Sequence, residues 1–90
     1  PTMTTRTDAD EARIARNVIR MLAEREGLEE QPTRAEIDAW TSAALSYAFG
    51  YIGEEDLDDS EVMCAAIDRL EADSVSIEFW RDLAAQGLTV

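Results

Sequence analysis

Six carboxylates crowd into one short stretch in the second half of the chain. Of the eight residues from 54 to 61, six are acidic: Glu54, Glu55, Asp56, Asp58, Asp59 and Glu61. Such a run can ligate a cation, exchange protons with a substrate or present negative charge to a basic partner. An EF-hand calcium loop needs glycine at its sixth position and glutamate at its twelfth. Counted from Glu54, these positions hold Asp59 and Ala65, so we predict no metal site.

The negative charge is concentrated in residues 35–90. The whole chain has 20 Asp and Glu, 8 Arg, and neither Lys nor His, for a net charge of −12. Residues 1–34 hold seven acids and six arginines, whereas residues 35–90 hold thirteen acids and two arginines. This balance disfavours direct binding to nucleic acid or anionic membranes and favours a basic protein. Because a row of carboxylates resembles a run of phosphates, we expect the six acids to bind a basic, nucleic-acid-binding partner.

The residue inventory argues against catalysis. Without histidine the chain lacks the commonest general base and the commonest zinc ligand. Cys64 is the one cysteine, so neither an internal disulfide nor a cysteine-rich zinc site can form, and we expect it to be buried in a cytoplasmic protein. No glycine-rich phosphate loop and no nucleophile beside a base occurs. We predict a non-enzymatic protein without a cofactor and, since no apolar run approaches 18 residues, without a membrane span.

Apolar spacing predicts a single domain, residues 1–90, of the all-α class. We expect a compact bundle of four helices at about residues 8–26, 34–52, 59–72 and 74–86. Residues 1–7 are expected to form a flexible N-terminus that begins with a cloning remnant. The helix starts are marked by Thr7 and by two capping-box pairs, and the helix ends by Gly27 and Gly87. The pairs are Thr33 with Glu36 and Asp58 with Glu61.

The predicted second helix carries no charge from Ala39 to Gly53. One face is apolar and the other is built of small residues, namely Ala39, Ser42, Ala43, Ser46 and Gly50. A helix without a charged face is usually buried on both sides. We therefore expect it to be the central helix, its small face covered by the fourth helix or by a second copy. A small structural or adaptor subunit that dimerises through residues 34–52 is the alternative function.

The tripeptide Asp73-Ser74-Val75 resembles the Asp-Ser-Leu attachment site of acyl carrier proteins, which are also small, acidic and four-helical. The resemblance implies a phosphopantetheine arm on Ser74. The competing interpretation, which we favour, is that Asp73 or Ser74 caps the fourth helix.

Arg13, Arg16 and Arg20 repeat along one face of the first predicted helix. We expect them to pair with acids of neighbouring helices rather than to contact nucleic acid. In size, charge and helicity the chain is similar to anti-defence proteins of phages, including DNA mimics and anti-CRISPR proteins, and to bacterial immunity proteins. The resulting hypothesis is an inhibitor that occupies a basic surface of a nucleic-acid-acting protein.

Overall fold

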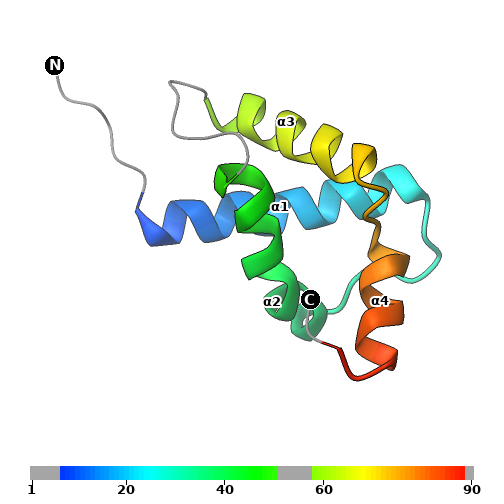
Figure 1. Cartoon of the computed structure of the whole chain (residues 1–90). Helices are drawn as coiled ribbons and strands as arrows, with labels where there is room; N and C mark the ends of the chain where they lie inside the picture. The colour runs from blue at the N-terminus through cyan, green and yellow to red at the C-terminus, as the bar shows by residue number, and fades with distance from the viewer. Residues whose placement is uncertain (1–6, 51–57, 89–90) are drawn as a thin grey trace, which may run out of the picture.

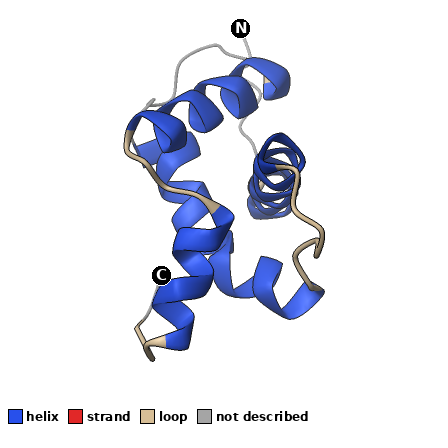
Figure 2. Cartoon of the chain, turned by 90° about the vertical axis from the view of Figure 1, so that its right-hand side faces the viewer, coloured by secondary structure: helices blue, strands red, loops and turns tan. Residues whose placement is uncertain are grey.

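The structure is a computed structural model, which describes residues 7–50 and 58–88. In chain order its elements are α1 (Asp8–Glu26), α2 (Arg34–Leu45), the π-helical turn η1 (Ser46–Gly50), α3 (Asp59–Ala72) and α4 (Ile77–Ala85). Within those two ranges the chain forms helices and loops but no strand, which confirms the predicted all-α class with four α-helices (Figure 2). Figure 1 shows α3 lying along α1, α2 crossing α1, and α4 near the C-terminal end of α1.

Helix α1 is the centre of the bundle. Its buried side chains recur at helical spacing and are at most 1% exposed; they are Ile14, Ala15, Val18, Ile19, Leu22 and Ala23. Helices α2, α3 and α4 all contact α1. Full burial of a Val, Leu or Ile side chain contributes about 1.5–3 kcal/mol, so this face is the largest apolar contribution that any one helix makes. The second helix, which we expected to be the central one, has the smaller buried face, formed by Ile37, Trp40 and Ala44.

Local side-chain hydrogen bonds begin the first three helices as the sequence predicts. Reciprocal capping boxes join Thr7 to Asp10, Thr33 to Glu36, and Asp58 to Glu61. Each satisfies two backbone N–H groups that would otherwise lack a partner at the helix start. Gly27 ends α1 with a φ of 65°, a left-handed conformation that glycine adopts without steric cost.

The second helix differs from its prediction in two ways. Regular α-helix ends at Leu45 and five π-helical residues follow, while residues 51–52 of the predicted span lie outside the described ranges. Most of the small face is also exposed. Ala39, Ser42, Ser46 and Gly50 are exposed in the single chain, whereas Ala43 is partly buried against the core. Small side chains expose little apolar area, so this face does not require burial. Its contact with a second copy stays a prediction.

Helix α4 begins at Ile77 and is capped by Ser76, whose side chain accepts a hydrogen bond from the backbone N–H of Phe79. The predicted caps, Asp73 and Ser74, instead belong to the end of α3. There Ser74 adopts a left-handed φ of 60°, and the N–H of Val75 donates to the carbonyl of Leu70 at 2.9 Å. This Schellman ending occupies the residues that sequence reasoning assigned to the next helix.

The C-terminal end of α4 matches its prediction. Gly87 has a left-handed φ of 77°, and the N–H of Leu88 donates to the carbonyl of Leu83 at 2.9 Å. A left-handed glycine followed by a hydrogen bond across six residues is typical of a Schellman ending.

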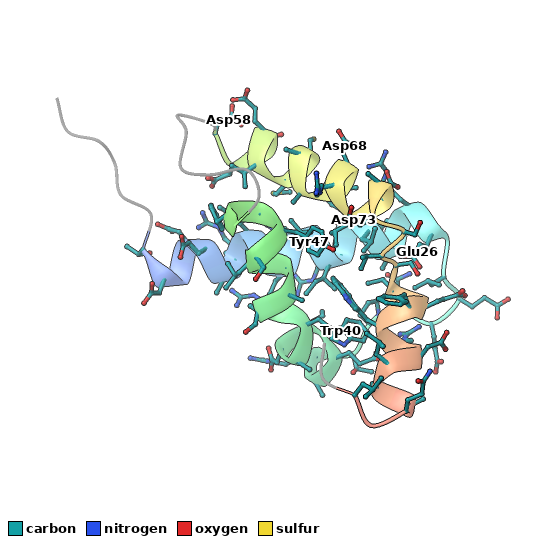
Figure 3. The ribbon with its side chains drawn as sticks, viewed as in Figure 1. Glu26, Trp40, Tyr47, Asp58, Asp68 and Asp73 are labelled. Atoms are coloured by element: carbon teal, nitrogen blue, oxygen red, sulfur yellow. The ribbon has the colours of Figure 1, made fainter. Side chains whose placement is uncertain are left out.

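Three contacts hold α4 against the rest of the bundle. The rings of Trp40 and Trp80 lie 5.5 Å apart between centroids, with their planes tilted by 38°. The Glu26 carboxylate accepts a hydrogen bond of 2.8 Å from the N–H of Ile77. Glu26 and Trp40 both lie beside α4 in Figure 3. The third contact, with Arg81, is the only one of the three that pairs two opposite charges.

Arg81 holds α4 to the start of α2. Its guanidinium donates to both carboxylate oxygens of Glu36, at 2.9 and 3.1 Å, and to the carbonyl of Glu30 at 3.1 Å. The two side chains of this ion pair are only 26% and 28% exposed. Hydrogen bonding from Arg81 lowers the pKa of Glu36 below its usual value and outweighs the opposing effect of burial. The same ion pair raises the pKa of Arg81.

Replacing Ser74 with glycine should stabilise the fold. A left-handed conformation costs a non-glycine residue about 1–2 kcal/mol, and the change removes this cost. Glycine also raises the conformational entropy of the unfolded chain, which offsets part of the gain. We expect the free energy of unfolding to rise by about 0.5–1 kcal/mol in urea titrations. The same substitution at the exposed helical Ser42 is the control and should lower it by about 0.5 kcal/mol. A loss of stability in both variants would contradict the strain at Ser74.

The ion pair with Arg81 should make stability depend on pH through Glu36. Because the folded-state pKa is lowered, the pair stabilises the fold above the usual pKa of glutamate, and this contribution is lost as the pH falls through the lowered value. Glu36→Gln keeps a capping-box side chain but removes the charge. We expect it to cost about 1 kcal/mol near pH 7 and progressively less as the pH falls through the lowered pKa of Glu36. Glu29→Gln, at an exposed acid, is the control; parallel pH profiles for wild type and Glu36→Gln would refute the coupling.

Candidate binding surface on helix α3

Three of the six predicted binding residues lie at the start of α3. Asp58 is the helix cap, and Asp59 and Glu61 belong to the first turn. All three are exposed. The other three predicted residues, Glu54, Glu55 and Asp56, lie outside the described ranges.

The three described acids have roles inside the fold. The N–H of Glu61 donates to Oδ1 of Asp58 at 2.8 Å, and the N–H of Asp58 donates to Oε1 of Glu61 at 3.2 Å. The Asp59 carboxylate accepts from the guanidinium of Arg13 at 3.2 Å. Each capping bond uses one oxygen and leaves the carboxylate charged and open to solvent. The residues can therefore both begin the helix and present negative charge.

The structure adds acids that the sequence prediction missed. Asp68 and Glu71 follow the predicted Glu61 at spacings of seven and three residues. These three acids and Cys64 are exposed on one side of α3. Figure 3 places Asp58 and Asp68 on the outer edge of α3. We define the acidic face of α3 as the exposed carboxylates Asp58, Glu61, Asp68 and Glu71. Asp59, which pairs with Arg13 of α1, and Asp73, the C-cap of α3, border this face. The helical spacing of the acids after Glu61 was the signal that would have identified them.

Two arginines beside this face form ion pairs with acids of the face and its border, but these ion pairs are weak. Arg25 lies 3.5 Å from Glu71, and Arg69 lies 3.5 Å from Asp73. The paired side chains are between 33% and 51% exposed, and ion pairs in such positions contribute about 0.2–1 kcal/mol. Asp68 makes no ion pair with any residue of the described ranges. The middle of the face thus carries a carboxylate that the described fold does not use.

Cys64 lies on the same side of α3 and is exposed, so the expectation of a buried cysteine is wrong. The helix turns its larger apolar side chains, Val62, Ile67 and Leu70, into the core. Position 64 falls on the opposite side. Cysteine chemistry at this position is that of a surface thiol.

The arginine prediction holds for one residue of three. Arg13 pairs with Asp10 at 3.6 Å and with Asp59 at 3.2 Å. Arg16 and Arg20 make no ion pair with the residues described here; they line a pocket instead. Within residues 7–50 and 58–88, the expected pairing of Arg16 and Arg20 with acids of neighbouring helices does not occur.

Ser74 is exposed and lies three residues before α4. In the resemblance to carrier proteins, the modified serine begins a helix. Here Ser76 has that position, and Ser74 belongs to the left-handed turn that ends α3. The local geometry of the tripeptide therefore differs from the one that the resemblance implies.

Two further observations concern other chemistry. Residues 7–50 and 58–88 contain no group of three Asp, Glu or Cys side chains placed to hold a metal ion. Over the same residues, no helix has both the length and the apolar composition needed to cross a bilayer.

Substitutions within the acidic face should separate structural carboxylates from free ones. Asp58→Ala removes the cap of α3 and should lower the free energy of unfolding by about 1 kcal/mol. Asp68→Asn should leave stability unchanged or raise it slightly, since it relieves repulsion among exposed acids. Urea titrations of both variants test this. A loss at Asp68 equal to that at Asp58 would mean that Asp68 has a structural role.

No protein-family model, no curated protein and no solved structure matches the chain.

Proposed function

We propose that this protein is a non-enzymatic binding protein whose acidic face on α3 occupies a basic surface of a nucleic-acid-acting protein. The observation that carries the proposal is the exposed row of carboxylates on α3, with Asp68 unpaired among the described residues. Glu54, Glu55 and Asp56 immediately precede α3 in sequence and extend the acidic run. In this proposal the chain acts as an inhibitor, by competing with nucleic acid for the same groove.

The charge distribution supports a basic partner. Self-repulsion on a chain of net charge −12 is unfavourable, and helix-dipole effects offset it only within the first turn of α3. Asp68 and Glu71 lie beyond that turn. A basic groove supplies the complementary field, accelerates encounter and disfavours acidic or neutral partners. Exposed charges are screened beyond about 8 Å at physiological ionic strength, so binding should weaken as salt rises.

The spacing of the acids defines what a basic groove must offer. From Glu61 to Asp68 the helix rises by seven residues, which corresponds to about 10.5 Å along its axis. Cationic side chains that lie a similar distance apart along a groove can therefore contact both carboxylates.

Affinity capture with matched charge variants tests the proposal. Wild-type protein is immobilised as bait for a lysate of the native host beside Asp68→Lys and Asp82→Lys, which have the same net charge. Asp82 is exposed on α4, away from the acidic face in sequence and structure. We expect a nucleic-acid-binding protein to be retained by wild type and Asp82→Lys and lost from Asp68→Lys. The captured protein is then purified and its affinity measured directly.

With the purified partner, Asp68→Lys should weaken binding tenfold or more, about 1.4 kcal/mol, and duplex DNA should displace the wild-type protein. The triple variant Glu54→Lys, Glu55→Lys, Asp56→Lys should weaken binding likewise while keeping its helical circular dichroism. Equal losses in Asp68→Lys and Asp82→Lys would show that only net charge matters. Failure of DNA to compete would overturn the proposed inhibition.

A further inference from the structure

A pocket of about 540 Å³, open to solvent on one side, lies between α1 and the beginning of α2. Its lining combines three cations, one acid and two apolar side chains: Arg16, Arg20, Arg34, Asp38, Pro32 and Ile37. Ligand pockets in proteins usually enclose about 300–1,000 Å³. The space is thus large enough for a small organic molecule and larger than a single inorganic ion needs.

The three arginines of this pocket differ from the other described arginines. Arg13, Arg25, Arg69 and Arg81 each make an ion pair. Arg16, Arg20 and Arg34 make none with any residue in the described part of the chain. Acids outnumber arginines by 20 to 8, so a shortage of available carboxylates does not explain this.

Their arrangement is unfavourable without an anion. Arg16 and Arg20 are four residues apart on α1, where like charges face each other and destabilise a helix by about 0.2–0.5 kcal/mol. Arg34 is the first residue of α2, at the positive end of the helix dipole. Three guanidinium groups therefore share one pocket, and Asp38 offsets only one of their charges.

We propose that this pocket binds an organic phosphate monoester. With Asp38 included, the four charged side chains carry a net charge of +2. A phosphate monoester carries about −1.5 to −2 at pH 7, so the charges balance. The planar guanidinium group donates paired hydrogen bonds that match phosphate oxygens. Pro32 is half-buried and, with the small exposed part of Ile37, forms an apolar part of the wall against which the organic group packs.

This site is independent of the acidic face. It is built from α1, α2 and the segment between them, whereas the acidic face belongs to α3. The failure of either proposal leaves the other standing.

Isothermal titration with three probes tests the site. The probes are phenyl phosphate, benzenesulfonate, which has the same ring but a single charge, and inorganic phosphate, which lacks the ring. We expect phenyl phosphate to bind at least tenfold more tightly than benzenesulfonate, because only a dianion matches the net charge of the pocket. It should also bind more tightly than inorganic phosphate, because the ring packs against Ile37 and Pro32.

Variants decide whether the arginines bind the phosphate. Arg20→Gln should weaken phenyl phosphate binding at least tenfold, and Arg20→Lys, which keeps the charge but loses the paired donors, should weaken it less. Arg25→Gln, on the same helix but outside the pocket, is the control and should bind as wild type does. Circular dichroism confirms that each variant folds. Without ligand, Arg20→Gln should be at least as stable as wild type, since repulsion with Arg16 is removed.

Two results would overturn the proposal. The first is the absence of saturable binding of phenyl phosphate below about 10 mM, where an interaction is weaker than any specific site requires. The second is equal affinity in Arg20→Gln and Arg25→Gln, which would assign the binding to dispersed surface charge.

Discussion

Covering the apolar face of α1 is the constraint on which the rest of the bundle depends. Six residues of that helix are inaccessible to solvent, and the three other α-helices contact it. A chain of 90 residues has a small interior, so a single long helix can supply much of the core. The partner helices then need only one apolar face each. Their outward faces are left to carry whatever charge function or solvation requires, and on α3 that charge is almost all negative.

Helix α4 is attached by different means. It has nine residues and buries only Ile77 and Trp80 completely. The contact between Trp80 and Trp40 supplies apolar area, and the bond from Ile77 to Glu26 satisfies one N–H at the helix start. The pairing of Arg81 with Glu36 joins α4 to the carboxylate that also accepts a hydrogen bond from the N–H of Thr33, the cap of α2. One carboxylate thus makes contacts that stabilise both α2 and α4, so the polar attachment of α4 to α2 depends on a single charged group.

Local signals were sufficient to predict most helix boundaries. Capping boxes such as Thr33 with Glu36 operate within four residues, so their chemistry can be recognised in the sequence alone. The start of α4 was mispredicted because Ser74 and Ser76 are both competent caps. Which one is used depends on how α3 ends. The exposed small face of α2 and the position of Cys64 depend on packing between helices, which a one-dimensional pattern does not contain.

The residues of the candidate sites likewise divide into those that local sequence signals identify and those that only the packing of helices brings together. Asp58, Asp59 and Glu61 were recognisable as a cluster because they are close in sequence, whereas Asp68 lies seven residues from Glu61 and joins them only through the helical spacing of α3. The pocket formed by Arg16, Arg20 and Arg34 brings together residues from two helices, and no sequence spacing relates Arg34 to the other two. Only the folded chain brings these three positive charges together, and none of them has an ion-pair partner among the described residues.

The exposed thiol of Cys64 can report whether the acidic face is occupied, because its rate of alkylation depends on access to that face. It is the chain's one cysteine, and it lies between Glu61 and Asp68 on the outer side of α3. An alkylating reagent therefore modifies a single position without any mutation. A protein seated on the carboxylates would slow that alkylation, whereas an anion held between α1 and α2 would leave its rate unchanged. The rate of one covalent reaction can thus distinguish occupancy of the two surfaces in the unmodified molecule.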